Sequence, residues 1–264
     1  MAANGDINLD KLQTRLFLRA ALPMTKVVRE DDKMIRLLTK NLTGIVQFEV
    51  KGDADAAAHM IFENDTLDVK PGRHENPTVA FVFKDLKGLN DFFAGRPALP
   101  SLLDCKGLYR LDILVRVVPL LLSLKILMPE ADPKDPEKRA LKVKLLLFMV
   151  TAAMSQMNKA GEPDIRELTE KSPDRVYQYE VEGGPAAYLR MKAGKTKAGR
   201  GIYARRRPFV KFYFPDFDSA YNVLTAKVAM VEAVSSGALQ LEGAMEYQKE
   251  IGLHMQRVEE ILTR

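Results

Sequence analysis

The chain has 264 residues, of which 47% are hydrophobic and 28% are charged, and its formal net charge is +5 at pH 7. This composition excludes an intrinsically disordered chain and a collagen-like repeat, and it is typical of a globular protein with one or two domains. The single cysteine, Cys105, excludes an internal disulfide, so the sequence does not call for an oxidising compartment.

The N-terminal segment, MAANGDINLDKLQTR, lacks the basic and then apolar order of a secretory signal. Two apolar runs, residues 113–128 and 145–153, are candidates for membrane spans. The first contains Arg116, Pro119 and Lys125, and the second is shorter than the roughly 20 apolar residues that a span needs. We therefore expect two buried helices and a cytoplasmic protein.

An internal repeat organises the chain. The segment IVQFEVKG at residues 45–52 recurs as VYQYEVEG at residues 176–183, which is 131 positions later. At the same offset, PTVAFVFKD at residues 77–85 recurs as PFVKFYFPD at residues 208–216. A repeat of this length has the size of a domain.

The repeat predicts two tandem domains of one fold, residues 1–130 and 140–264. The segment PEADPKDPEKR at residues 129–139 is rich in proline and charge, and we expect it to be the joint between them.

Comparing the two copies predicts which strand positions face the core, because a core position stays apolar in both copies. Three alternating positions do so in the Phe-rich strand, namely Val79, Phe81 and Phe83 with their counterparts Val210, Phe212 and Phe214. The first strand of each copy behaves likewise at Val46, Phe48, Val50 and Tyr177, Tyr179, Val181.

Each copy is expected to form a helix, several strands in meander order, a short helix, a final strand and a closing helix. Asp85 and Asp216 are placed to cap the short helices with their side chains. The final strands are expected to begin at Gly107 and Gly237. Strands grouped between helices indicate the α+β class.

The pattern PxVxFxFxD, followed by a short helix, an apolar turn and G(A/L)(L/Y)xL, resembles the sterol carrier protein 2 domain family. The second copy matches over FPDFDSAYNVLTAKVAMVEAVSSGALQLEG, residues 214–243, whereas the first departs from the pattern at GRPALPSLLDCKG, residues 95–107. The resemblance implies that each domain has a mostly antiparallel five-stranded sheet that encloses an apolar tunnel with its helices.

The resemblance also implies carriage of a sterol, acyl or isoprenoid ligand. It places around the tunnel a set of apolar side chains from both copies, Val210, Phe212, Phe214, Val228, Val231, Val234, Ile251, Met255 and Val258 in the second and Val79, Phe81 and Phe83 in the first. From periodicity alone, these side chains are equally typical of a packed core. The alternative functions are a substrate-presenting accessory subunit of a lipid-metabolising enzyme and an interaction scaffold with closed cavities.

Residues 190–207 contain eight basic residues and no acidic one. Such a segment attracts anionic lipid headgroups or phosphates, and the expected headgroup ligands are Arg200, Arg205, Arg206 and Arg207. A transient anionic membrane surface is therefore an expected partner. A solvated strand edge would have the same composition.

The sequence offers little for catalysis or metal binding. His59 and His74 align with Arg190 and Arg205 of the second copy, which indicates solvated basic surface, and His254 lies at the margin of an apolar helix stripe. The sequence contains none of the usual nucleotide, zinc or nucleophile motifs and no nucleic-acid-binding signature. We expect no cofactor, no metal, no nucleic-acid partner and no enzymatic activity.

Overall fold

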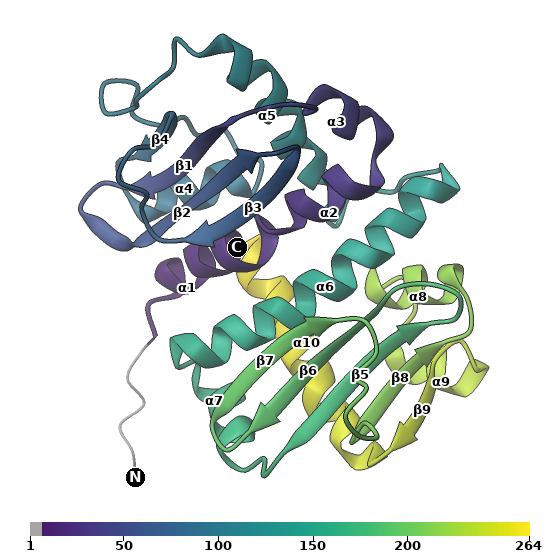
Figure 1. The fold of residues 1–264 in the computed structure, drawn as a ribbon. Helices are drawn as coiled ribbons and strands as arrows, with labels where there is room; N and C mark the ends of the chain where they lie inside the picture. The colour runs from purple at the N-terminus through teal and green to yellow at the C-terminus, as the bar shows by residue number, and fades with distance from the viewer. Residues whose placement is uncertain (1–6) are drawn as a thin grey trace. The chain divides into compact units, whose positions relative to one another are not determined.

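The computed structural model describes residues 7–264 and divides into two compact units, Asn8–Met128 and Pro129–Leu262. Each unit contains one sheet with strands of both directions and several helices (Figure 1). The expected α+β class is therefore confirmed.

The first unit contains a four-stranded sheet in the order β3-β2-β1-β4. Its strands are β1 (Gly44–Val50), β2 (Asp53–Glu63), β3 (Thr66–Pro71) and β4 (Val79–Phe83). Its helices are α1 (Leu9–Leu16), the π-helical turn η1 (Phe17–Ala21), α2 (Met24–Asp31), α3 (Lys33–Leu38), α4 (Leu86–Phe93), α5 (Leu111–Ser123) and the 3₁₀ turn η2 (Leu124–Leu127).

The second unit contains a five-stranded sheet in the order β7-β6-β5-β8-β9. Its strands are β5 (Arg175–Val181), β6 (Ala186–Lys192), β7 (Lys195–Arg200), β8 (Val210–Phe214) and β9 (Gln240–Gly243). Its helices are α6 (Pro136–Ala160), α7 (Pro163–Glu170), α8 (Phe217–Leu224), α9 (Met230–Ser236), the 3₁₀ turn η3 (Met245–Tyr247) and α10 (Gln248–Thr263).

The sequence repeat coincides with a repeat in strand pairing. Strand β1 pairs in parallel with β4 from Val46 opposite Val79 onward, and β5 pairs in parallel with β8 from Tyr177 opposite Val210 onward. Both pairs are thus related by the same 131 positions. The parallel pairs replace the expected meander, because alternation fixes the face of a strand but not its neighbour. The remaining strand pairs are antiparallel.

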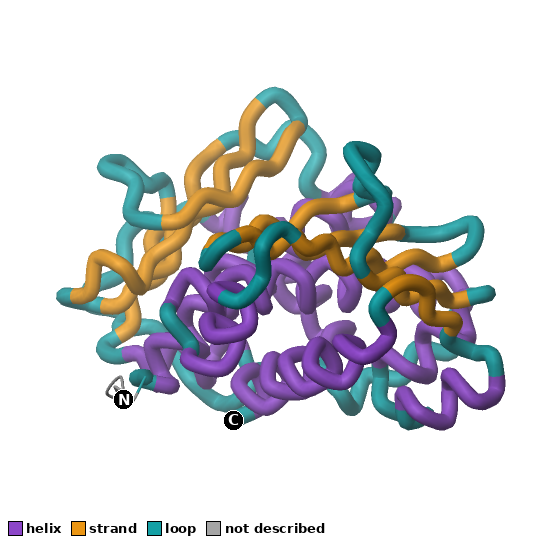
Figure 2. Tube along the Cα trace, turned by 90° about the horizontal axis from the view of Figure 1, so that it is seen from below, coloured by secondary structure: helices purple, strands orange, loops and turns teal. Residues whose placement is uncertain are grey.

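In each unit the helices cover one face of the sheet, as Figure 2 shows by colouring strands orange and helices purple. The turn η1 lies against β2 and β3, and α4 lies against β1 and β4. In the second unit α6 lies along β6 and β7 and packs on α8. The single long helix α6 thus takes the place that α1, η1 and α2 share in the first unit.

Helix α6 is, among the described residues, the one helix long and apolar enough to cross a membrane by length and composition. In the structure 67% of its most apolar stretch is buried. Its contacts with α7, α8 and two strands are those of a core helix.

The final strand expected after Gly107 does not form. Instead, Lys106 makes a single antiparallel bridge with Ala80 at the edge of β4, and the chain then enters α5. A Cβ on Gly107 would lie 2.0 Å from the carbonyl oxygen of Thr78, and one on Gly243 would lie 2.2 Å from that of Phe209, the residue equivalent to Thr78. Gly107 therefore corresponds to Gly243, at the end of the edge segment and not at its start.

The helices after the Phe-rich strands begin at the predicted caps. The carboxylate of Asp85 accepts a hydrogen bond from the Gly88 amide at 2.8 Å, and that of Asp216 accepts one from the Ser219 amide at 2.7 Å. Each carboxylate satisfies an amide that the first helical turn leaves open.

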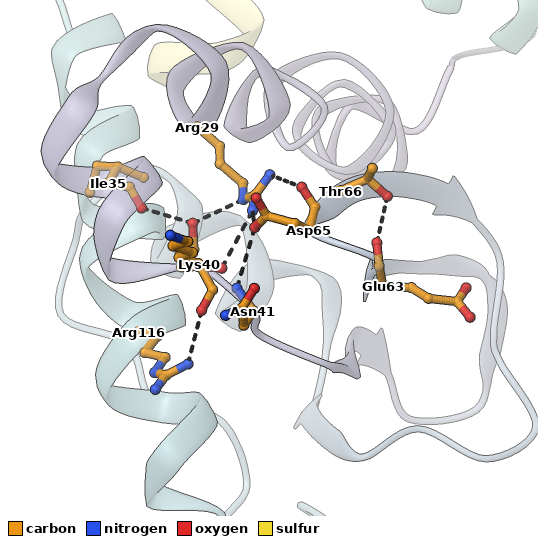
Figure 3. Close-up of polar contacts among 9 residues, drawn as sticks. Arg29, Ile35, Lys40, Asn41, Glu63, Asp65, Thr66 and Arg116 are labelled. Carbon is orange, nitrogen blue, oxygen red and sulfur yellow. Dashed lines mark hydrogen bonds and ion pairs between the residues drawn. The ribbon is translucent and has the colours of Figure 1, made fainter.

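A buried arginine ties the helices of the first unit to its sheet (Figure 3). Arg29 of α2 donates through Nε to the Thr39 hydroxyl at 2.9 Å and through Nη1 to the Asp65 carbonyl at 2.8 Å. Its Nη2 also forms an ion pair with the Asp65 carboxylate at 2.5 Å. These contacts satisfy a charge that burial would otherwise make costly.

Candidate functional site

The inward face of the second sheet, which we call the β5 face, is the candidate site. Strand β5 is its central strand (Figure 1). The register places Tyr177 and Tyr179 beside Val210 and Phe212 of β8. On the other side they face Leu189 and Ala187 of β6, which are fully buried. The neighbours of the two tyrosines on adjoining strands are therefore apolar.

The equivalent face of the first unit is filled by aromatic rings. Phe48 stacks on Phe81 with ring centroids 5.2 Å apart, and it meets Phe93 edge to face at 5.4 Å. Phe92 packs on Phe83 at 5.3 Å, and Phe17 from η1 stacks on Phe93 at 5.8 Å. Six rings, including the mutual contact of Phe92 and Phe93, thus form one cluster.

The second unit has smaller side chains at two of these positions. Helix α8 is the counterpart of α4, and its Val223 and Leu224 stand where α4 has Phe92 and Phe93. The two helices have equal length and the same aspartate cap. By this equivalence, α8 has aliphatic side chains at the two positions where α4 has aromatic rings.

Two hydroxyl groups lie buried at the β5 face. Tyr177 and Tyr179 are 0% and 2% exposed, and neither hydroxyl has a hydrogen-bond partner among the described residues. Burial raises the pKa of Tyr177 to about 12, against a smaller lowering by the guanidinium of Arg175, and it raises the pKa of Tyr179 further. Both phenols are therefore neutral at pH 7 and able to donate a hydrogen bond.

Arg175 continues the row of Tyr177 and Tyr179 on the same face of β5. Its guanidinium lies over the rings of Phe209 and Tyr247, at 4.6 Å and 4.2 Å from their centroids. The inward row on the central strand is therefore a guanidinium followed by two phenols. The corresponding positions of the first unit are Gly44, Val46 and Phe48, which carry no polar side chain.

The predicted strand residues lie as expected. Val79, Phe81, Phe83, Val210, Phe212 and Phe214 are all buried. On α10, Ile251 and Val258 are buried and Met255 is half-buried, and Val228 before α9 is also half-buried. The burial of these α10 residues agrees with the apolar stripe that was expected on the last helix.

Two of the residues that were predicted to line the tunnel are exposed instead. Val231 and Val234 are 76% and 36% exposed, because α9 turns Ala233 inward instead. At 100° per residue, a short helix that buries Ala233 directs Val231 and Val234 to other sides. Neither valine lines an enclosed site in this structure.

The four predicted headgroup arginines have different surroundings. Arg200 stands opposite Ala187 on the inward side of its sheet and lies over the ring of Phe148. Arg206 forms an ion pair with Asp174 at 2.5 Å. Arg205 and Arg207 are exposed. Residues 201–209 fold back over the sheet, where Gln178 accepts a hydrogen bond from the Tyr203 amide at 3.0 Å.

The expectation that His59 lies on solvated surface is wrong. His59 is buried because the loop after β3 covers the outer face of the sheet: the His74 ring lies 5.3 Å from the His59 ring, and the His74 amide donates to Gln47 at 2.6 Å. His254 is also buried, and desolvation lowers its pKa.

Burial likewise raises the pKa of the Cys105 thiol, which favours its unreactive form. Within residues 7–264 no group of three His, Cys, Asp or Glu side chains is placed to hold a metal ion.

No family model and no curated protein matches this sequence. Among solved structures, the inverting sec-alkylsulfatase Pisa1 from Pseudomonas sp. is similar with 16% identity and a TM-score of 0.26, over 56% of this chain and 28% of the alkylsulfatase. The chain thus matches little more than a quarter of the alkylsulfatase.

Several sterol carrier protein 2 structures are similar at low identity and partial coverage. The sterol carrier protein domain 2 of Helicoverpa armigera has 20% identity and a TM-score of 0.30, over 48% of this chain and 94% of its own length. Sterol carrier protein 2 of Yarrowia lipolytica has 13% identity and a TM-score of 0.28, over 38% and 87%.

The presence of an alkylsulfatase among these structures contradicts the expectation that the chain is not an enzyme. That expectation depended on the lack of a recognisable catalytic motif in the sequence, and motifs identify only the constellations already known. We withdraw it.

The unpaired hydroxyls of Tyr177 and Tyr179 were not anticipated from the sequence, although the inward orientation of these residues was predicted. The signal was present in the repeat, because Val46 and Phe48 of the first copy become Tyr177 and Tyr179 in the second. An inward position that gains a hydroxyl needs a partner for it, since a buried unpaired hydroxyl costs about 1–3 kcal/mol.

Proposed function

We propose that the chain binds an apolar, lipid-like ligand, and that the second unit holds it between the β5 face and the covering helices. The observation that carries this proposal is the contrast between the two units at equivalent positions. The first unit fills its inward face with six phenylalanine rings, whereas α8 presents Val223 and Leu224 where two of those rings would be.

The apolar neighbours of β5 support the proposal, because burial of a lipid chain against them contributes roughly 0.8 kcal/mol per methylene. The classes of ligand that we propose are the acyl, sterol and isoprenoid compounds. A membrane surface and a lipid-metabolising enzyme are the partners that would supply or consume such a ligand.

Substitution Val223→Phe tests the proposal by giving α8 the ring that α4 has at Phe92. We expect the intact chain to retain lipid on gentle purification, detected by native mass spectrometry, and to bind a fluorescent fatty acid that unlabelled lipid displaces. The variant should lose both properties. The control variant is Val231→Phe, because Val231 is exposed, and it should bind lipid as the wild type does. Leu89→Phe would not serve as a control, because Leu89 is buried.

Loss of stability separates the alternatives. If the space beside Val223 is packed core, the added ring should lower the free energy of unfolding by about 1–3 kcal/mol. A wild-type chain without bound lipid, together with a destabilised Val223→Phe variant, would contradict the proposal.

A further inference from the structure

We propose that the second unit binds the anionic oxygen head of its ligand through Arg175, Tyr177 and Tyr179, so that it selects amphipathic anions over neutral lipids. This inference rests on the proposed function and adds a polar subsite to it. The first unit lacks these groups and has no such selectivity.

The two hydroxyls carry the inference. Both tyrosines are more than nine-tenths buried, both hydroxyls lack a hydrogen-bond partner among the described residues, and both belong to the inward side of β5. Two such groups on adjacent inward positions are costly unless something accepts their hydrogen bonds. An oxygen atom of a ligand bound against β5 would satisfy them.

The charge of the head follows from Arg175. Its guanidinium is held over two aromatic rings, and it forms no ion pair with a carboxylate in the described part of the chain. Burial raises the pKa of Tyr177, and the Arg175 guanidinium near that hydroxyl lowers it by a smaller amount. Glu250 acts on the same hydroxyl in the opposite direction, but its effect is smaller than that of Arg175.

A neutral phenol can only donate to a bound anion, and a guanidinium can only donate as well. The row therefore presents one guanidinium and two hydroxyl groups that can all donate to a carboxylate or sulfate oxygen. The apolar side chains on either side, Leu189 and Val210, would contact the chain of the same ligand.

The experiment compares dodecanoate with its methyl ester, which has the same chain but no charge. Wild-type protein should bind dodecanoate about tenfold more tightly than the ester in calorimetric titrations, since hydrogen bonds to a charged group are the stronger ones. The double variant Tyr177→Phe, Tyr179→Phe should lose that difference and keep its affinity for the ester. Arg175→Met should weaken dodecanoate binding alone.

Tyr188→Phe is the matched control, because it removes a hydroxyl from the opposite side of the same sheet. It should leave both affinities unchanged. A second readout is thermal stability without ligand: removal of two unpaired hydroxyls should leave the melting temperature unchanged or raise it, whereas a structural role would lower it. The single variant Tyr179→Phe allows the same comparison of melting temperatures after the loss of one hydroxyl instead of two.

The outcomes are distinct for the two proposals. Equal binding of dodecanoate and its ester by the wild type would overturn the polar subsite and leave the proposed lipid binding intact. If the tyrosine variants lost affinity for dodecanoate and for its ester equally, the polar subsite would also be overturned. If the wild type bound neither probe, the proposed function would fail and the subsite with it.

Discussion

Tyr179 stacks on Phe212 across β5 and β8, with ring centroids 4.8 Å apart and ring planes 10° from parallel. Phe48 and Phe81 occupy the equivalent positions of the first unit and stack at 5.2 Å and 18°. The two units thus keep one aromatic pair in one register, and they differ by a single hydroxyl at its centre. That hydroxyl has consequences for stability as well as for binding.

The first prediction concerns alkaline pH. A tyrosine in the unfolded chain has a pKa of about 10, whereas folding raises that of Tyr177 to about 12 and that of Tyr179 further. Above pH 10 the unfolded state therefore releases protons that the folded state retains, and the free energy of unfolding falls as pH rises. Below pH 10, the contribution of these two phenols to the free energy of unfolding is fully present.

Urea unfolding from about pH 9 to about pH 11 should show this decline. The double variant Tyr177→Phe, Tyr179→Phe should decline less steeply. Tyr221, whose pKa burial raises to about 12, remains in the variant and keeps part of the slope. The same slope in both proteins would mean that the two buried phenols titrate normally.

The second prediction concerns the paired glycines. Gly107→Ala and Gly243→Ala each place a Cβ within about 2 Å of a backbone carbonyl, at a φ of +68° and +94° respectively. Both should lower the free energy of unfolding by more than the roughly 1 kcal/mol that a positive φ alone costs. The measurement is denaturant unfolding of the intact chain.

Gly52→Ala is the control, because its φ is +79° and a Cβ there would meet nothing within 4 Å. It should show only the cost of the backbone conformation. If all three variants were destabilised equally, the carbonyl contacts would be unimportant, and so would the structural equivalence of Gly107 and Gly243.

Much of the fold could be predicted because the repeat supplies an internal comparison. It identified the inward rows of the strands and the two aspartate caps, since both depend on residues within a few positions of one another. The edge of the first sheet could not be placed, because Gly107 and Gly243 lie 136 positions apart and not 131. The sequence between them changes length, and local patterns do not reveal where.

The candidate site was only partly predictable for a related reason. Helix α9 has seven residues and apolar side chains on several sides, so periodicity does not determine which side faces inward. The structure turns Ala233 inward and leaves Val231 exposed. By contrast, strand alternation predicted that Tyr177 and Tyr179 face inward. It does not predict whether their hydroxyls have hydrogen-bond partners.

The third prediction concerns Arg29. Substitution Arg29→Met removes the hydrogen bonds that the guanidinium donates to Thr39 and Asp65, so it should destabilise the chain by about 2 kcal/mol. Asp65→Asn should cost less, because the carbonyl of residue 65 still accepts from the guanidinium. Denaturant unfolding at neutral pH compares the two.

Asp65 also predicts an acid dependence. The Asn41 amide and then the Arg29 guanidinium hold the pKa of Asp65 below its usual value. Its contribution to stability is therefore present above the unfolded pKa of about 3.9 and is lost as pH falls through the folded pKa. Asp65→Asn should lack this component, and an unchanged acid profile in that variant would contradict the assignment.

The last prediction concerns the basic segment and anionic membranes. Arg205 and Arg207 are exposed, whereas Arg206 is engaged with Asp174. If the segment docks on anionic lipid, the double variant Arg205→Gln, Arg207→Gln should bind anionic vesicles more weakly than Arg206→Gln does, because each free cation near the surface contributes about 1 kcal/mol. Vesicle sedimentation measures the difference. Binding of the wild type should weaken as salt rises, since screening acts over about 10 Å at 0.1 M. Equal binding to anionic and neutral vesicles, or equal effects of the two variants, would leave these arginines with the role of solvated charges at a strand edge.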